Sequence, residues 1–176
     1  VLFRSGVVVG VFNDAALAAE AHKLGEGGPL TASFNTEEHH EFSLPFDSEA
    51  TVVKLSDGKY VGRRGLAKNM SCDMGPSALL DLGGIQVVVI THRCQCLDPM
   101  QLELFGVDIA QARVVVVKSR GHFRSGFDEF FKPDQIYEVD CPGLTSPVLA
   151  NFNWTGLPRP VYPLDEDTTW TPPTTV

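Results

Sequence analysis

The sequence predicts a single α/β domain in which helices flank a mixed β-sheet. Short apolar runs of strand length, such as "VVVGVF" (7–12), alternate along the chain with helix-like segments. Two such runs flank the pair Gly83-Gly84, a spacing typical of an antiparallel hairpin. Hydrophobic residues make up 43% of the 176 residues and charged residues 20%, which indicates one globular domain with a core.

Capping residues locate the elements of the first half. The Ala-rich helix "AALAAEAHKL" (15–24) can be capped by either Asn13 or Asp14, and Gly25 would end it. Asp57-Gly58 is a turn signal. The strands predicted in this half are 7–12, 30–34 and 50–55.

The second half of the chain also alternates strand-like with helix-like segments. "DPMQLELFG" (98–106) is a short helix with Asp98 at its N-cap, Pro99 at its first position, Gln101 as a capping-box partner and Gly106 at its end. The other elements predicted are the hairpin strands 77–82 and 85–93, a buried strand 113–118, a helix 122–131 and a strand 135–140.

Composition excludes several classes of function. A net charge of −8 argues against nucleic-acid binding. No apolar run approaches the roughly 20 residues that span a bilayer, and no signal peptide is visible. Four scattered cysteines do not form a disulfide framework, so we expect reduced thiols and a cytoplasmic protein. Oligomeric state is not indicated.

The two ends of the chain differ from its body. It opens without Met, and we interpret residues 1–6, "VLFRSG", as the scar of a truncation. Residues 7–164 form the predicted domain. Residues 165–176 are dominated by Thr, Pro and acidic residues, which predicts a disordered tail.

Two clusters resemble metal sites. His39 and His40 lie among Glu37, Glu38 and Glu41, but adjacent side chains of an extended segment point to opposite faces, which favours a solvated acidic loop.

His92, Cys94 and Cys96 share one face of the predicted strand and are residue types that bind zinc. Val88 and Ile90 lie on the same face, so we interpret all of these residues as a continuing core face. Neither cluster predicts a metal site.

The segment after the last valine run is the best candidate for chemistry. Lys118, Ser119, Arg120, His122 and Arg124 follow one another where a strand gives way to a helix. Unpaired N–H groups at a helix N-terminus attract anions, and basic side chains would add to that attraction. The phenylalanines of this helix share one face, and His122 lies off it. The alternative, a solvated turn, stays open.

Seven motifs in the same order resemble the carboxy-terminal domain of the microcystinase C-like family, whose members are proposed zinc metallopeptidases named after a microcystin-degradation protein. The resemblance runs from about Val7 to Asp165. The motifs are "VVVGVFND", "LSDGKYV", "DMGPSALLDLGGIQVVV", "LDPMQLELFGVD", "VVVVKSRGHFRSGF", "VDCPGLTSP" and "RPVYPLD".

The resemblance implies an accessory domain of a zinc-dependent peptide or amide hydrolase. In that family a larger amino-terminal domain supplies the His, Asp and Glu ligands of zinc, and no part of this chain matches them. The resemblance implies no cofactor in this chain, its own amino-terminal domain as partner, and a role for Lys118, Ser119, His122 and Arg124 at the substrate cleft or the domain interface. Family members open the domain with a Gly-rich segment beginning Asp-Asn-Pro-Gly, where this chain has "VLFRSG". The alternative is a non-catalytic domain that binds an anionic small molecule or partner.

Overall fold

The computed structural model describes residues 6–36, 42, 44–119, 121–141, 146 and 148–172. The chain divides into two compact units, Val1–Ile136 and Tyr137–Val176. All the strands found in the described residues belong to the first unit. The predicted α/β class is confirmed.

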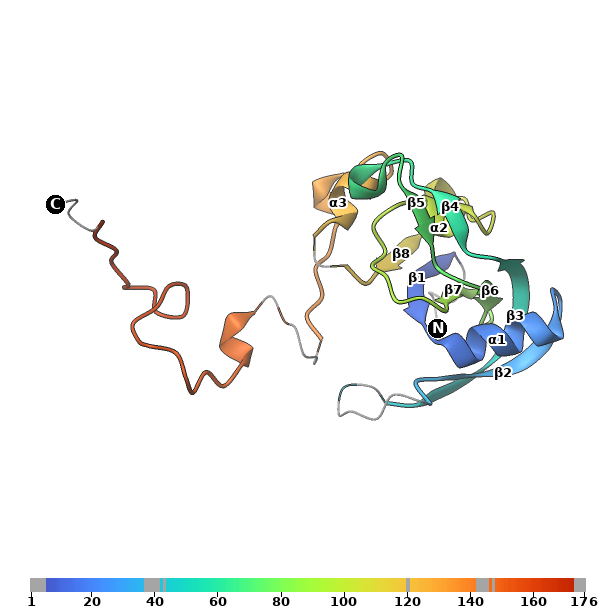
Figure 1. The fold of residues 1–176 in the computed structure, drawn as a ribbon, viewed down its shortest axis with the longest axis horizontal. Coiled ribbons are helices and arrows are strands. Elements are labelled where there is room, and N and C mark those ends of the chain that lie inside the picture. Colours follow the sequence, from blue (N-terminus) through green and yellow to red (C-terminus); the bar gives the residue numbers. More distant parts are fainter. Residues whose placement is uncertain are drawn as a thin grey trace. The chain divides into compact units, whose positions relative to one another are not determined.

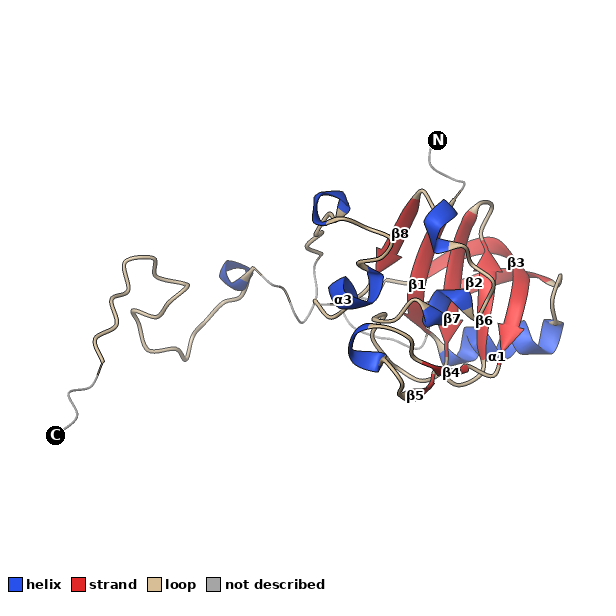
Figure 2. Ribbon diagram, turned by 90° about the horizontal axis from the view of Figure 1, so that it is seen from above, coloured by secondary structure: helices blue, strands red, loops and turns tan. Residues whose placement is uncertain are grey.

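A six-stranded mixed sheet forms the centre of the first unit, in the order β2-β3-β6-β7-β1-β8 (Figures 1 and 2). Strand β1 runs parallel to β7 and to β8, whereas the other neighbours are antiparallel. Strands β4 and β5 form a separate antiparallel pair. The strands are β1 (Val7–Asn13), β2 (Pro29–Phe34), β3 (Phe46–Ser56), β4 (Lys59–Val61), β5 (Ser71–Asp73), β6 (Ser77–Asp81), β7 (Ile85–Ile90) and β8 (Val114–Val117).

Both faces of the sheet are covered. Successive strand residues point to opposite faces, so each strand contributes side chains to both packing layers. Helix α1 (Ala15–Leu24) packs on one face, where Leu80 and Val89 meet its Leu17 (Figure 2). On the other face, Leu79 and Val88 contact a second cluster. That cluster draws on α2 (Met100–Glu103), the 3₁₀ helix η2 (Ile109–Gln111) and α3 (Phe123–Phe127). The remaining 3₁₀ helices are η1 (Gly65–Ala67), η3 (Pro133–Gln135) and η4 (Leu149–Asn151).

Helix α1 and the β6–β7 hairpin form where their capping and turn residues predicted them. Of the two candidate caps for α1, Asp14 is the one used, since its Oδ1 accepts from the Leu17 N–H at 3.0 Å. The β6–β7 hairpin is antiparallel, and Gly83 and Gly84 both have positive φ at its turn. Leu82 N–H donates to the Ile85 carbonyl at 2.8 Å to close it.

Three predicted elements are corrected. No strand forms at 135–140: the 3₁₀ helix η3 ends at Gln135, and residues 136–140 form neither helix nor strand. The helix predicted at 122–131 is regular only over Phe123–Phe127. The valine strand β8 is not buried, because it is the edge strand of the sheet and leaves Val114 and Val116 exposed. A run of valines fits an edge and a centre equally well.

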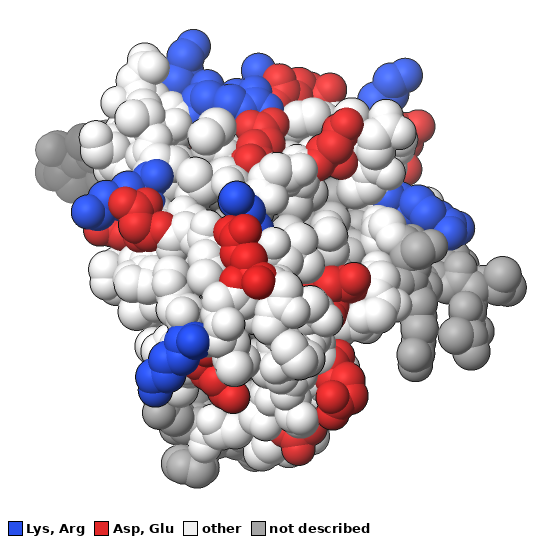
Figure 3. All heavy atoms as spheres, turned by 90° about the vertical axis from the view of Figure 1, so that its right-hand side faces the viewer, with Lys and Arg blue, Asp and Glu red and all other residues white. Residues whose placement is uncertain are grey.

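One face of the molecule carries charges of both signs. On the face drawn in Figure 3, outside the grey atoms, Lys and Arg side chains are interspersed with Asp and Glu. Among the described residues, no helix is long and apolar enough to cross a membrane.

Candidate functional site

Three neighbouring parallel strands bring distant residues together at their carboxyl ends, which we call the carboxyl edge of the sheet. Strands β7, β1 and β8 end at Ile90, Asn13 and Val117 and run in the same direction. In open α/β sheets, ligands bind beyond the carboxyl ends of such strands. Lys118 and Ser119 directly follow β8, so the strand order places them at this edge.

Hydrogen bonds connect the segments that leave this edge. The Asn13 carboxamide donates to the Thr91 carbonyl at 3.0 Å and accepts from Arg93 Nε at 3.3 Å. Ser119 Oγ donates to Gln95 Oε1 at 3.3 Å. The loop after β7 therefore joins the predicted site. Sequence reasoning missed Asn13, Arg93 and Gln95, because only the order of the strands reveals that they lie together.

A buried glutamine shapes the loop that carries Gln95. Gln101 is fully buried on α2, and its Oε1 accepts from the N–H groups of Leu97 and Asp98 at 2.8 and 3.0 Å. Its Nε2 donates to the Gln95 carbonyl at 3.0 Å. Buried polar groups must be paired, and here one carboxamide pairs three groups of a single loop. The backbone at Gln95 is consequently held in place.

Asp98 joins this loop to the loop before η1. Its side chain is fully buried, and Oδ2 accepts from the backbone N–H groups of Arg63 and Arg64, each at 2.8 Å. Oδ1 accepts from the Met100 N–H at 2.8 Å. The predicted helix 98–106 is regular only over Met100–Glu103, so Pro99 and not Asp98 precedes its first residue. The predicted capping box forms in one direction only: the Gln101 side chain accepts from the Asp98 N–H, whereas the Asp98 side chain accepts from Met100 and not from Gln101.

Charged contacts fix helix α3 beside these loops. Arg63 Nε donates to Glu103 at 2.7 Å, and its guanidinium also contacts Glu129. Arg64 contacts Asp128. Hydrogen bonds from Glu103 and Glu129 raise the pKa of Arg63, so its charge persists at any physiological pH. Close packing adds to this attachment, because a Cβ at Gly126 would lie 2.1 Å from a backbone oxygen of the neighbouring loop.

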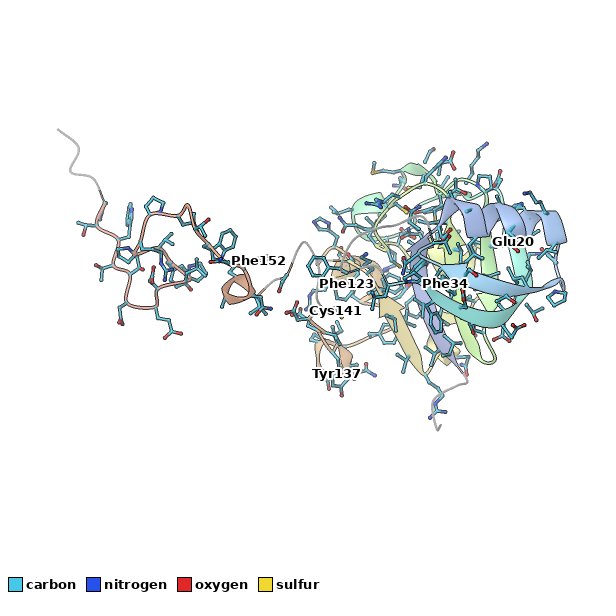
Figure 4. All side chains as sticks on the ribbon, turned by 90° about the horizontal axis from the view of Figure 1, so that it is seen from below. Glu20, Phe34, Phe123, Tyr137, Cys141 and Phe152 are labelled. Carbon is cyan, nitrogen blue, oxygen red and sulfur yellow. The ribbon has the colours of Figure 1, made fainter. Side chains whose placement is uncertain are left out.

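The predicted phenylalanine face of α3 is confirmed. Phe127 is buried, while Phe123 packs against the same core cluster and is labelled in Figure 4. His122 precedes the helix and is exposed, and the Arg124 guanidinium lies 5.2 Å from the centre of the Phe123 ring. Arg120 lies outside the described residues. Contact of any of these side chains with substrate stays a prediction.

The predicted core face His92–Cys94–Cys96 is wrong in two of its three members. Strand β7 ends at Ile90, because the N–H groups of Thr91 and His92 turn to the Met74 carbonyl. His92 and Cys94 are exposed, and only Cys96 is buried. Burial raises the pKa of the Cys96 thiol, which keeps it protonated at physiological pH.

The described residues do not fit a zinc ion. They contain no group of three or more His, Cys, Asp or Glu side chains close enough to hold a metal. The pair His39 and His40 lies outside the described residues.

A hollow of mixed polar and apolar lining lies at the opposite, amino ends of the parallel strands β1 and β7. It has a volume of about 330 Å³ and is lined by the starts of β1 and β7, including Val8 and Gln86, together with Phe105 and Val107. It brings together no nucleophile and base. We therefore place the candidate site at the carboxyl edge, where polar side chains from separate segments meet.

Comparison with known families settles the relationship. The family described as "MlrC C-terminus" matches residues 3–156. The chain belongs to this family. The resemblance to microcystinase C-like proteins is thereby confirmed.

One solved structure supports the same assignment. The MlrC C-terminus chain is similar to a crystal structure named "Putative metallopeptidase from Mesorhizobium sp. BNC1", with 26% identity and a TM-score of 0.73. The similarity covers 95% of this chain and 33% of that one, so this chain spans about a third of the length of the solved protein. No curated protein matches the chain.

Proposed function

We propose that this chain is the carboxy-terminal domain of a zinc-dependent peptide or amide hydrolase, and that it helps to form the substrate cleft. The observation that carries the proposal is the family match over residues 3–156, together with the likeness to a longer protein named as a metallopeptidase. The parent protein, as we use the term, is the longer polypeptide that contains this domain. Its amino-terminal domain would be the partner of this chain.

Zinc would be held by the amino-terminal domain of the parent protein. The resemblance to the microcystinase C-like family supports this placement, because the amino-terminal domain supplies the His, Asp and Glu ligands in that family. A catalytic zinc site needs about three protein ligands and an open position for water. When bound, the metal would activate water and polarise the scissile carbonyl.

The residues of this chain would bind and orient the substrate. Lys118 and Arg124 carry positive charge beside the carboxyl edge, and guanidinium groups bind carboxylates through two parallel hydrogen bonds. His122 is exposed and can donate a hydrogen bond. Ser119 and Gln95, already paired, would line the same cleft. Acidic or carboxylate-bearing peptides are the substrates that suit this edge.

Paired measurements on the parent protein test the role of the edge. We expect His122→Ala and Arg124→Ala each to lower kcat/KM about 10- to 100-fold, the effect of losing one hydrogen bond to a charged group. The control is Arg113→Ala, which removes an arginine from the other end of β8. Full activity of either site variant would contradict the cleft role. Binding of an anionic small molecule without any hydrolysis would favour a non-catalytic domain.

A further inference from the structure

The second unit contains a stretch with an unusual composition, residues 148–165, which we call the C-terminal segment. Its eighteen residues include only two charged side chains, Arg159 and Asp165. These two contact each other: Arg159 Nε lies 2.6 Å from Asp165 Oδ2, and Nη2 contacts Oδ1. The Val161 N–H donates to the same carboxylate at 2.6 Å. The charges of the segment are therefore neutralised within it.

Large apolar side chains of this segment face solvent. Tyr162 is 73% exposed and Trp154 is 41% exposed. Disordered segments stay in solution because they are rich in charge and poor in aromatic residues, and this segment has the opposite composition. Trp and Tyr are enriched at interfaces because each combines a large apolar body with a polar group. The exposed apolar residues are Val148, Leu149, Trp154, Leu157 and Tyr162.

Local contacts hold these groups in a defined arrangement. The Trp154 indole N–H donates to the Leu149 carbonyl at 2.6 Å, and the Trp154 ring lies 5.5 Å from that of Phe152, which is labelled in Figure 4. The Asp165 N–H donates to the Val161 carbonyl at 3.0 Å. A surface that is already ordered loses less entropy on binding, and Trp and Tyr are the residues that most often dominate interface energy.

We propose that the C-terminal segment is a docking strap, which inserts its aromatic side chains into an apolar groove on the metal-binding domain of the parent protein. The length of the solved relative argues for this occupant. The solved chain is about three times as long as this one, and the similarity covers 95% of this chain. Most of the C-terminal segment therefore has a counterpart in that protein. The remaining two thirds of that protein could supply the surface that covers the segment. The inference rests on the proposed function and names the surface through which its two domains associate.

Hydrogen–deuterium exchange on the parent protein and on this chain alone tests the strap. We expect the amides of residues 148–165 to exchange at least 10-fold more slowly in the parent protein. In the parent protein, Trp154→Ser and Tyr162→Ser should abolish this protection and also deprotect one surface of the metal-binding domain. The control is Leu24→Ser, which changes an apolar residue on α1 whose exposure is similar to that of Trp154 and should leave protection unchanged.

The exchange experiment gives different results if something other than the metal-binding domain covers the C-terminal segment. Equal protection in this chain alone would overturn the proposal, and dependence of that protection on protein concentration would identify a second copy as the occupant. Deprotection by Trp154→Ser within residues 6–136 would overturn it in favour of packing on the first unit. Zinc content and hydrolysis are measured on the same samples. A parent protein that binds zinc and hydrolyses peptides with an unprotected segment refutes the strap alone, whereas one without zinc or hydrolysis refutes the proposed function.

Discussion

Replacement of Asp98 by Asn should destabilise the first unit strongly although it keeps the shape of the side chain. The carboxylate is fully buried and accepts hydrogen bonds from three backbone N–H groups, those of Arg63, Arg64 and Met100. In Asp98→Asn one oxygen becomes an NH₂ group. The remaining oxygen can keep the hydrogen bonds from the Arg63 and Arg64 N–H groups. The Met100 N–H group then faces the new NH₂ group, which is also a donor.

The magnitude follows from the count of unpaired donors. A buried donor without an acceptor costs about 1–3 kcal/mol, and the new NH₂ group adds another unpaired donor. We expect a loss of about 3 kcal/mol from a total stability of about 5–15 kcal/mol. For a domain of this size, that loss lowers Tm by roughly 6–12 °C.

Urea unfolding of the purified chain, followed by circular dichroism, measures this loss. The matched control is Asp108→Asn. Asp108 is exposed and caps η2 through one hydrogen bond to the Ala110 N–H at 3.1 Å. Since Asn caps helices as well as Asp does, the control should change stability by under about 0.5 kcal/mol. If Asp98→Asn costs no more than Asp108→Asn, then the buried carboxylate does not hold the two loops together.

Three further outcomes are expected. Gly126→Ala should cost about 1–3 kcal/mol in urea unfolding because its Cβ would meet a backbone oxygen at 2.1 Å, whereas Gly121→Ala, with open space around it, should be neutral. Hydrogen bonds from Arg159 lower the pKa of Asp165 from 3.8 to about 2, so its ion pair should be complete above pH 4 and lost as pH falls through 2; a carboxyl NMR titration with a midpoint near 4 would contradict this. Truncation after Asp165 should leave Tm unchanged, as a disordered tail requires, and a clear drop would show that the tail is packed.

Much of the fold could be predicted because its signals are local. The cap of α1, the Gly83-Gly84 hairpin and the pairing of Asp98 with Gln101 each involve residues close together in the sequence. Position within the sheet was not predictable in this way. The exposure of Val114 follows from the place of β8 at the edge, which depends on partners more than a hundred residues away.

Some residues of the candidate site could likewise be predicted from the sequence, and others could not. The run from Lys118 to Arg124 is continuous in the sequence and carries a family motif, so sequence reasoning could select it. The contribution of Asn13 and Gln95 depends on the parallel neighbours β7, β1 and β8. His92 was misplaced because the departure of the chain from β7 is set by the Met74 carbonyl, on the segment before β6.

The proposed division of labour between the two domains is tested by peptide hydrolysis, measured for the parent protein and for this chain after zinc loading and after chelation. We expect the zinc-loaded parent protein to hydrolyse a peptide and chelation to abolish the activity. We expect this chain alone to retain no zinc and to have no activity. One equivalent of zinc bound by this chain and lost on replacement of Cys94 and Cys96, or hydrolysis by a metal-free parent protein, would refute the proposed function.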